Sequence, residues 1–300
     1  VVFINVMRAG PSTGVPTKTE QGDLWQALGA SQGDFERFIV APKNALDAFA
    51  CVPELFNYVD RAQCPGIVIS DLLISEGTFS VDPDSIDMHP KIDRGALISD
   101  PSPNGNYLRY ADTESGISPR VVPGYEGFVH TVATDEHDED GVLISDEFTH
   151  PHKRRTMVEK RARKFNGVAA DIPAPELEGP ADAEVTLVGW GSTYGVILEA
   201  REILAKQGVV TNQLPITWIV PFKGKEVSKI LTGCKKVLIV ENNYSGQFAR
   251  YMRSETGFSA DGHIRKYDGE PFMPHHVAES VLELMETGAE VHVPYQEMIV

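Results

Sequence analysis

An arginine, Arg8, directly follows an apolar run, Val1–Met7, and begins a loop rich in glycine, proline and hydroxyl side chains. In an open parallel sheet, ligands bind beyond the carboxyl ends of the strands, so a side chain at this place can reach a ligand. The planar guanidinium matches a carboxylate with two parallel hydrogen bonds, which makes Arg8 a candidate anchor for an organic acid. The alternative is an ion pair between Arg8 and a nearby aspartate that staples the loop.

The loop after Arg8, Ala9–Gly14, lets the backbone approach a ligand closely and offers two hydroxyls, those of Ser12 and Thr13. Together with Thr17 these are weaker candidates for substrate contact, because hydroxyls also hold turns together. We predict a substrate site made of Arg8, Ser12 and Thr13, and we assign a catalytic role to no side chain of the chain.

Composition excludes several classes of partner. The chain has 300 residues, of which 42% are hydrophobic, and a formal net charge of −16. Such a surface repels nucleic acid and anionic membranes, and no basic stripe overrides it. No apolar run is long enough to span a membrane, and no signal peptide is recognisable. We therefore expect no nucleic-acid and no membrane partner.

The three cysteines, Cys51, Cys64 and Cys234, are widely spaced, and no C-x-x-C is present. This spacing argues against a zinc ribbon or an iron–sulfur cluster held by the chain alone. It is typical of a reducing cytoplasm, which is the location we predict. Because Val1 is not methionine and lies inside a strand-like run, we expect the sequence to be a piece of a longer protein.

Two α/β regions flank a less regular one. In residues 1–75, strand and helix patterns alternate, which predicts a parallel sheet covered by helices. Residues 76–182 form a predicted interdomain arm and linker with one charged helix, and residues 183–300 a predicted doubly wound domain. The predicted strands are Val1–Met7, Arg37–Ala41, Gly66–Leu73, Glu184–Val188, Thr211–Ile219, Lys236–Glu241, Ile264–Tyr267 and Glu290–Val293. The predicted helices are Glu20–Ala30 (with Thr19 as N-cap), Ala45–Asp60, Glu147–Phe165, Thr193–Gln207, Gly224–Leu231, Ser245–Glu255 and Pro274–Thr287.

Six strings occur in the order found in the α subunits of 2-oxoacid:ferredoxin oxidoreductases. They are RAGPSTGVPTKTEQGDL from Arg8, YLRYADTESGISPRVVPG, EHDEDG followed by MVEKRARK, VGWGSTYGVILEA, VENNYSGQFAR and KYDGEPF. Together they span nearly the whole chain, which resembles the 2-oxoglutarate type most closely. Met7 departs from the pattern, in which glutamine is expected, and this weakens any inference about the substrate.

The resemblance implies a fold class and a division of labour. Residues 1–75 resemble the second half of a thiamine-pyrimidine-binding domain, followed by a transketolase C-terminal-like doubly wound domain. The family's activity is oxidative decarboxylation of a 2-oxoacid, such as 2-oxoglutarate, to acyl-CoA, using coenzyme A and passing electrons to ferredoxin. Thiamine diphosphate, its metal ion and an iron–sulfur cluster are implied on a partner β subunit, and Arg8 matches the residue that holds the substrate carboxylate.

Two other functions share part of this pattern. The β chain of a lipoamide-dependent 2-oxoacid dehydrogenase has the same two-domain layout but lacks the RAGPSTG string. A truncated, non-catalytic assembly module is the second alternative.

Four further features have both a functional and a structural interpretation. Gly189–Thr193 follows a strand like a phosphate cradle but lacks the P-loop lysine, so we expect a tight turn. Glu136–Glu147 nearly fits a calcium loop, yet the residues before it are strand-like, so we expect an acidic turn. The histidines at 130, 137, 150 and 152 lack a known ligand spacing, so we predict no metal site. Glu241 is expected in a buried polar network at a subunit seam, with catalysis as the alternative.

Overall fold

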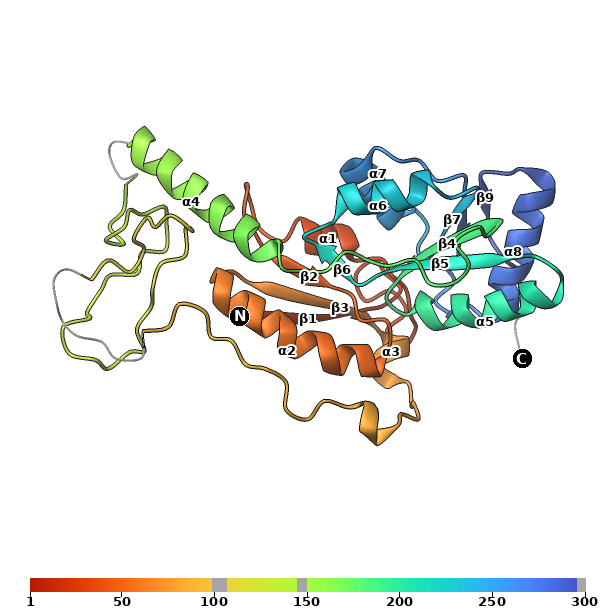
Figure 1. Ribbon diagram of the computed structural model, residues 1–300, viewed down its shortest axis with the longest axis horizontal. Coiled ribbons are helices and arrows are strands. Elements are labelled where there is room, and N and C mark those ends of the chain that lie inside the picture. Colours follow the sequence, from red (N-terminus) through yellow and green to blue (C-terminus); the bar gives the residue numbers. More distant parts are fainter. Residues whose placement is uncertain (99–106, 145–149, 296–300) are drawn as a thin grey trace.

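Two sheets built mainly from parallel strands form the frame of the protein, of which the computed structural model describes residues 1–98, 107–144 and 150–295 (Figure 1). The first sheet has the order β1-β3-β2-β6, in which β1 (Val2–Met7), β3 (Gly66–Asp71) and β2 (Phe38–Val40) are parallel. Strands β2 and β3 are buried along their whole length, as expected of a parallel sheet covered on both faces.

The second sheet has the order β5-β4-β7-β8-β9, and all of its strand pairs are parallel. Its strands are β4 (Val185–Trp190), β5 (Thr211–Ile216), β7 (Val237–Glu241), β8 (Gly262–Arg265) and β9 (Val291–His292). Helices α5 (Thr193–Lys206) and α8 (Pro274–Thr287) cover one face, and α6 (Gly224–Thr232) and α7 (Gln247–Thr256) cover the other (Figure 1). The α/β fold class with parallel sheets is therefore confirmed.

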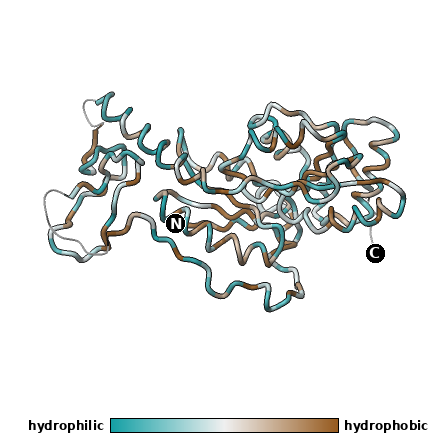
Figure 2. The backbone as a smooth tube through the Cα atoms, viewed as in Figure 1, coloured by the Kyte–Doolittle hydropathy of each residue, from teal (hydrophilic) through white to brown (hydrophobic). Residues whose placement is uncertain are grey.

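The two sheets share one apolar core. Residues of the first sheet and of α1 (Leu24–Leu28), such as Met7, Leu24 and Ile69, belong to the same buried cluster as Trp190 and Phe248 of the second region. In Figure 2 hydrophobic stretches occur in both of these regions. Because this surface is covered only when the two sheets are together, burial itself holds them in contact.

One predicted strand, Thr211–Ile219, is instead two strands in different sheets. The chain leaves the second sheet after β5 and pairs again as β6 (Trp218–Val220), antiparallel to β2, in the first sheet. Periodicity predicts one continuous strand here, because it contains no information about which sheet a strand joins.

The predicted helix Glu20–Ala30 is shorter than expected. Helix α1 covers only Leu24–Leu28, and Asp23, not Thr19, precedes it. Residues 19–22 are not helical, because the backbone amides of Thr19 and Gln21 bind the carbonyls of Gly269 and Asn242 in loops of the second sheet. Tertiary hydrogen bonds here override a local helical preference.

The other predicted helices begin and end within four residues of their predicted bounds, and the predicted start of the charged helix, Glu147, lies outside the described residues. Helix α2 (Ala45–Ala62) lies against the first sheet, α3 (Leu72–Glu76) follows β3, η1 (Pro83–Ser85) is a short 3-10 turn in the arm, and α4 (Pro151–Ala169) is the charged helix. Helices α3 and η1 were not predicted, and α3 begins at Leu72, inside the predicted strand Gly66–Leu73. Asn44 caps α2 by accepting the amide hydrogen of Asp47 at 2.8 Å. Phe165 and Val168 of α4 join Phe38 and Tyr58 in a core on the outer face of the first sheet.

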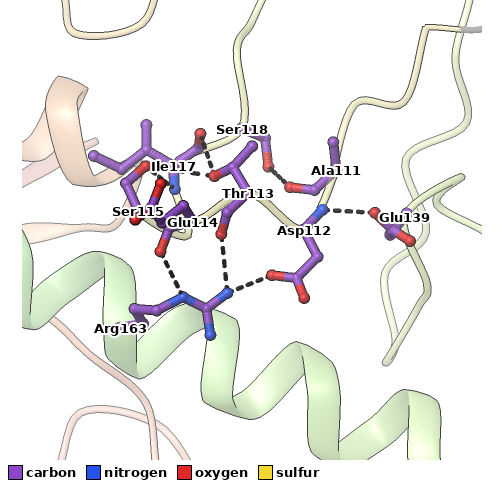
Figure 3. A network of polar contacts seen from close by, with 9 residues as sticks. All are labelled: Ala111, Asp112, Thr113, Glu114, Ser115, Ile117, Ser118, Glu139 and Arg163. Carbon is purple, nitrogen blue, oxygen red and sulfur yellow. Dashed lines mark hydrogen bonds and ion pairs between the residues drawn. The ribbon is translucent and has the colours of Figure 1, made fainter.

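The arm between α3 and α4 docks on α4 through polar contacts (Figure 3). The guanidinium of Arg163 donates to the carboxylate of Asp112 and to the carbonyls of Thr113 and Glu114, the last at 3.0 Å. Gly116 approaches the helix so closely that an added Cβ would lie 2.5 Å from the carbonyl oxygen of Lys160, at a φ of +76°. The arm is thus held on α4 by close backbone packing at Gly116 as well as by the ion pair and hydrogen bonds of Arg163.

None of the helices in the described ranges combines the length and the apolar character that crossing a bilayer requires. At the edge of the first sheet, strand β1 exposes apolar side chains to solvent, including 59% of Phe3 and 66% of Ile4. The division into residues 1–75, 76–182 and 183–300 stays a prediction, and β6 shows that the last of these segments also contributes to the first sheet.

Candidate functional site

A cleft of about 680 Å³ lies where the carboxyl ends of the two sheets meet. Three segments form its walls: the end of β1 with the loop after it, the stretch before α1, and the loop between β7 and α7. The lining side chains or backbones belong to Asn5, Val6, Arg8, Gly10, Pro11, Ser12, Glu20, Gly22, Asp23, Gln26, Asn243, Tyr244, Ser245 and Gln247. This is the edge at which parallel α/β sheets bind their ligands.

The loop after β1 is closed on itself. The amide of Val15 donates to the carbonyl of Ala9 at 2.9 Å, and Ala9 itself is buried. Gly14 has a φ of +52°, and an added Cβ would lie 1.9 Å from the Ala9 oxygen, so only glycine fits there. The closed loop places Arg8 at its base and Ser12 at its tip on the same side, in the cleft lining.

The Arg8 side chain is exposed in the cleft. Within the described residues it makes no hydrogen bond and no ion pair, although the carboxylates of Glu20 and Asp23 line the same cleft. The loop-stapling ion pair considered from the sequence is therefore not formed with any described residue. A guanidinium with open donors at this place is suited to an anionic ligand.

The predicted hydroxyl residues are not all brought together. Ser12 lines the cleft beside Arg8, whereas Thr13 is exposed and outside the lining, and Thr17 faces a separate hollow with Leu73 and Glu270. The roles of Arg8, Ser12 and Thr13 in substrate binding stay predictions, of which Arg8 and Ser12 share one site.

Two carboxylates in the cleft, Glu20 and Asp23, were not singled out from the sequence. Partial burial, followed by the nearby charge of Asp268, raises the pKa of Glu20, and a hydrogen bond from the backbone of Gly269 partly offsets this. Asp23 accepts a hydrogen bond from the side-chain amide of Asn5 at 3.2 Å. Both acids belong to the string RAGPSTGVPTKTEQGDL, but nothing in its spacing indicates that both face the cleft.

Glu241 holds the opposite wall in place. Its buried carboxylate accepts the amide hydrogens of Phe248 at 2.9 Å and Ala249 at 3.2 Å, at the start of α7, and the side-chain amide of Asn243 at 2.8 Å. Burial raises its pKa, and these hydrogen bonds act in the opposite direction. Since Glu241 does not line the cleft, the geometry favours the buried network over catalysis, and the subunit seam stays a prediction.

Gly189–Thr193 forms a tight strand-to-helix turn. The Thr193 hydroxyl accepts the amide hydrogen of Trp190 at 3.0 Å and lies 2.8 Å from its carbonyl. The Ser192 hydroxyl donates to Asp71, at the end of β3, and so ties the turn to the first sheet. A hydroxyl that binds a neighbouring carboxylate is in a structural role, in agreement with the expected turn.

The acidic turn of the arm is bound by basic side chains of α4. Glu136 pairs with Arg154 and Arg161, and Asp138 pairs with Lys153. Residues 145–149, and with them Glu147, lie outside the described residues. Across the part of the chain that the structure describes, no three His, Cys, Asp or Glu side chains converge as metal ligands would.

The cleft does not fit a diphosphate group. Its lining contains one cationic side chain, Arg8, and two carboxylates, Glu20 and Asp23. A diphosphate would be repelled by these acids, whereas a single carboxylate can bind at the Arg8 end. The residues present therefore suit an organic acid better than the phosphate end of a coenzyme.

Comparison with known proteins identifies the family. A model of the pyruvate flavodoxin/ferredoxin oxidoreductase family, described as thiamine diphosphate-binding, matches residues 1–156, just over half of the chain. A second model, pyruvate:ferredoxin oxidoreductase core domain II, matches residues 183–277.

Individual relatives agree with these models. The chain is 37% identical to 2-oxoacid:ferredoxin oxidoreductase 2, subunit alpha, of Aeropyrum pernix, over 97% of this chain and 44% of that protein. It is 31% identical to 2-oxoglutarate oxidoreductase subunit KorA of Mycobacterium tuberculosis, over 85% of this chain and 38% of that protein.

Among solved structures, 2-oxoglutarate:ferredoxin oxidoreductase from Magnetococcus marinus, with 2-oxoglutarate, coenzyme A and succinyl-CoA bound, has a TM-score of 0.82 and 29% identity. The match covers 94% of this chain and 48% of that one, so the chain spans about half the length of the relatives it matches. On the strength of the family models and these relatives, the chain belongs to the 2-oxoacid:ferredoxin oxidoreductase family, as part of an α subunit.

Proposed function

We propose that this chain forms the acid-binding wall of the active site in a 2-oxoacid:ferredoxin oxidoreductase. The enzyme would oxidatively decarboxylate 2-oxoglutarate or a related 2-oxoacid to an acyl-CoA, and electrons would leave singly to ferredoxin. The single observation that carries the proposal is the Arg8 guanidinium. It lines the cleft at the junction of the two sheets and binds no described residue.

The charge distribution of the cleft favours one place for a carboxylate. Glu20 and Asp23 repel a carboxylate, and Arg8 attracts it, so the acid head lies at the Arg8 end with the Ser12 hydroxyl beside it.

Arg8 would contribute to binding and alignment more than to bond breaking. A carboxylate is held equally in the ground state and in the early transition state, and its charge disappears as carbon dioxide leaves. Removing the guanidinium should therefore raise KM more than it lowers kcat.

The coenzyme and metal belong to the partner in this proposal. Thiamine diphosphate supplies the electron sink for decarboxylation when it is bound in the assembled complex. Because the cleft of this chain does not suit a diphosphate, we assign the diphosphate, its metal ion and an iron–sulfur cluster to a β subunit. The absence of C-x-x-C spacing among Cys51, Cys64 and Cys234 supports this assignment.

Support for 2-oxoglutarate comes from relatives. The Mycobacterium tuberculosis protein is a 2-oxoglutarate oxidoreductase subunit, and the Magnetococcus marinus structure contains 2-oxoglutarate and coenzyme A. Met7, beside Arg8, stands where the family pattern has glutamine, and this leaves a related 2-oxoacid as the alternative substrate.

Neither family model favours a lipoamide-dependent dehydrogenase or a non-catalytic module. The free cysteines support a cytoplasmic location.

The proposal is tested by purifying the full-length α chain with its co-expressed partner and assaying ferredoxin reduction with 2-oxoglutarate, pyruvate and other 2-oxoacids. We expect reduction that requires both a 2-oxoacid and coenzyme A, and a partner whose cluster absorbs visible light. Reduction with no 2-oxoacid, or activity that requires a lipoyl protein, would show that the proposed function is wrong.

A further inference from the structure

Gln21 ties the stretch before α1 to the second sheet through every hydrogen-bonding group it has, and Asp23 of the same stretch binds Asn5 of β1. Gln21 is fully buried. Its backbone amide donates to the carbonyl of Asn242 at 2.6 Å, and its backbone carbonyl accepts from the side-chain amide of Asn243 at 3.1 Å. Its side-chain Nε2 donates to the carbonyl of Trp190 at 2.7 Å, and its Oε1 accepts the amide hydrogen of Asn242 at 2.9 Å.

The partners of Gln21 are the ends of two adjacent strands. Trp190 is the last residue of β4, and Asn242 directly follows β7. The side chain thus binds one carbonyl and one amide of the second sheet, at two separate points. A primary amide provides a donor and an acceptor at a fixed spacing, which a carboxylate or an apolar side chain of the same length does not.

The neighbours of Gln21 form the cleft. Glu20, Gly22 and Asp23 line one wall, and Asn243, which binds the Gln21 carbonyl, lines the other. A shift of Gln21 relative to β4 and β7 therefore changes the width of the cleft and moves the carboxylates relative to Arg8. Catalytic geometry is sensitive to displacements of about 1 Å.

We propose that Gln21 is a positioning residue that sets the register between the two sheets and thereby the geometry of the acid-binding cleft. It acts through the backbone and does not touch the substrate. This inference rests on the proposed function, because one readout of the role of Gln21 is the KM for the 2-oxoacid. Its other readout is the protection of the junction amides, those of Gln21 and Asn242, from hydrogen exchange. This readout is independent of any activity.

The first test compares Gln21→Met with Gln213→Met in the full-length complex. Gln213 is also buried and donates to Glu178 at 2.6 Å, but unlike Gln21 it has no neighbour in the chain that lines the cleft. Because both variants leave buried groups unpaired, both should lower Tm by roughly 3–8 °C. We expect KM for the 2-oxoacid to rise about tenfold or more in Gln21→Met only, with kcat changed less.

The second test uses Gln21→Glu, which preserves the shape. A protonated glutamic acid can donate to the Trp190 carbonyl and accept from the Asn242 amide, whereas the carboxylate faces that carbonyl without a proton. Burial disfavours the charged form. We therefore expect KM near the wild-type value at low pH and a rise in KM with increasing pH that wild type measured in parallel does not show.

Hydrogen exchange separates this inference from the proposed function. In Gln21→Met, the amides of Gln21 and Asn242 should lose protection while those of β5 keep it, whatever the substrate of the enzyme is. Unchanged junction protection, or a KM that moves equally in Gln21→Met and Gln213→Met, would overturn the positioning role. If wild type turns over no 2-oxoacid but the junction amides lose protection, the proposed function fails and the register role stands.

Discussion

Around Gln21, buried amide and backbone groups bind one another where the two sheets meet, whereas between the arm and α4 partly exposed arginines bind carboxylates. Gln21 and Asn243 represent the first region, and Arg163 and Glu136 the second. Buried neutral hydrogen bonds are little affected by salt, while partly exposed ion pairs are screened by it. Salt should therefore disturb the contacts of Gln21, beside which the cleft lies, less than the contacts that dock the arm on α4.

The largest expected effect is at the shared core. Trp190 is fully buried between the sheets beside Phe248. We expect Trp190→Ala to lower the free energy of unfolding by about 3–5 kcal/mol, because it leaves a cavity in a core that both sheets use. Chemical denaturation measures the change, and Val129→Ala, at an arm residue that is 93% exposed, is the control expected to change it little. Equal effects of the two substitutions would contradict the shared core.

Gly116 tests how the arm docks on α4. We expect Gly116→Ala to destabilise the docked arm by about 2 kcal/mol, because the added Cβ meets the Lys160 carbonyl and φ is +76°. Gly124→Ala is the matched control, since it also has a positive φ, +110°, but its Cβ meets no atom within 4 Å. Limited proteolysis of the arm should be faster in Gly116→Ala than in the control. Equal rates would attribute the effect to backbone strain alone.

Acid should release the arm before the junction. Burial raises the pKa of Asp71 and Glu241, so their contribution to stability is present at low pH and is lost as pH rises through the folded pKa. Glu136 and Asp138 behave in the opposite way. Burial raises their pKa, but hydrogen bonds from Arg161 to Glu136 and from Lys153 to Asp138 outweigh it and lower the pKa below the ordinary 4.5 and 3.8.

The contribution of Glu136 and Asp138 is therefore present above their ordinary pKa values and is lost as pH falls through the lowered ones. Below about pH 4 we expect arm amides to lose protection first, as measured by hydrogen exchange corrected for its intrinsic pH dependence. Simultaneous loss of protection in the arm and at the junction would contradict the assignment.

The smallest expected effect is that of a single arm arginine. Arg163→Gln should weaken docking of the arm by about 1 kcal/mol, because it removes one partly exposed ion pair and hydrogen bonds to two carbonyls. The effect should shrink at high salt, when the ion pair of wild type is already screened. Arg155→Gln, whose partner Glu159 lies on the same helix, is the control and should leave the arm docked.

Much of the fold could be predicted because buried parallel strands are apolar runs with helices between them. Helix α8 has the predicted bounds, Pro274–Thr287, and β7 differs from its prediction by one residue. The misplaced start of α1 and the split of the predicted strand Thr211–Ile219 have one cause. Both depend on contacts with the other sheet, which local periodicity does not contain.

The site was predictable in part for the same reason. Arg8 could be placed at a strand end, because its position follows from the strand before it. Glu20 and Asp23 could not be placed, because they face the cleft only after Gln21 has bound Trp190 and Asn242, more than 160 residues away in the chain. Tyr244 likewise lines the cleft because of tertiary packing, and no local sequence signal indicates this.

The most direct test of the account is the KM for the 2-oxoacid in the full-length complex carrying Arg8→Lys. Lysine keeps the charge but loses the planar two-point grip, so we expect KM to rise roughly 10- to 100-fold while kcat changes much less. Arg155→Lys, on α4 and outside the cleft, is the control and should leave KM unchanged. An unchanged KM in Arg8→Lys, with the complex folded and active, would contradict the anchoring of the substrate carboxylate by Arg8.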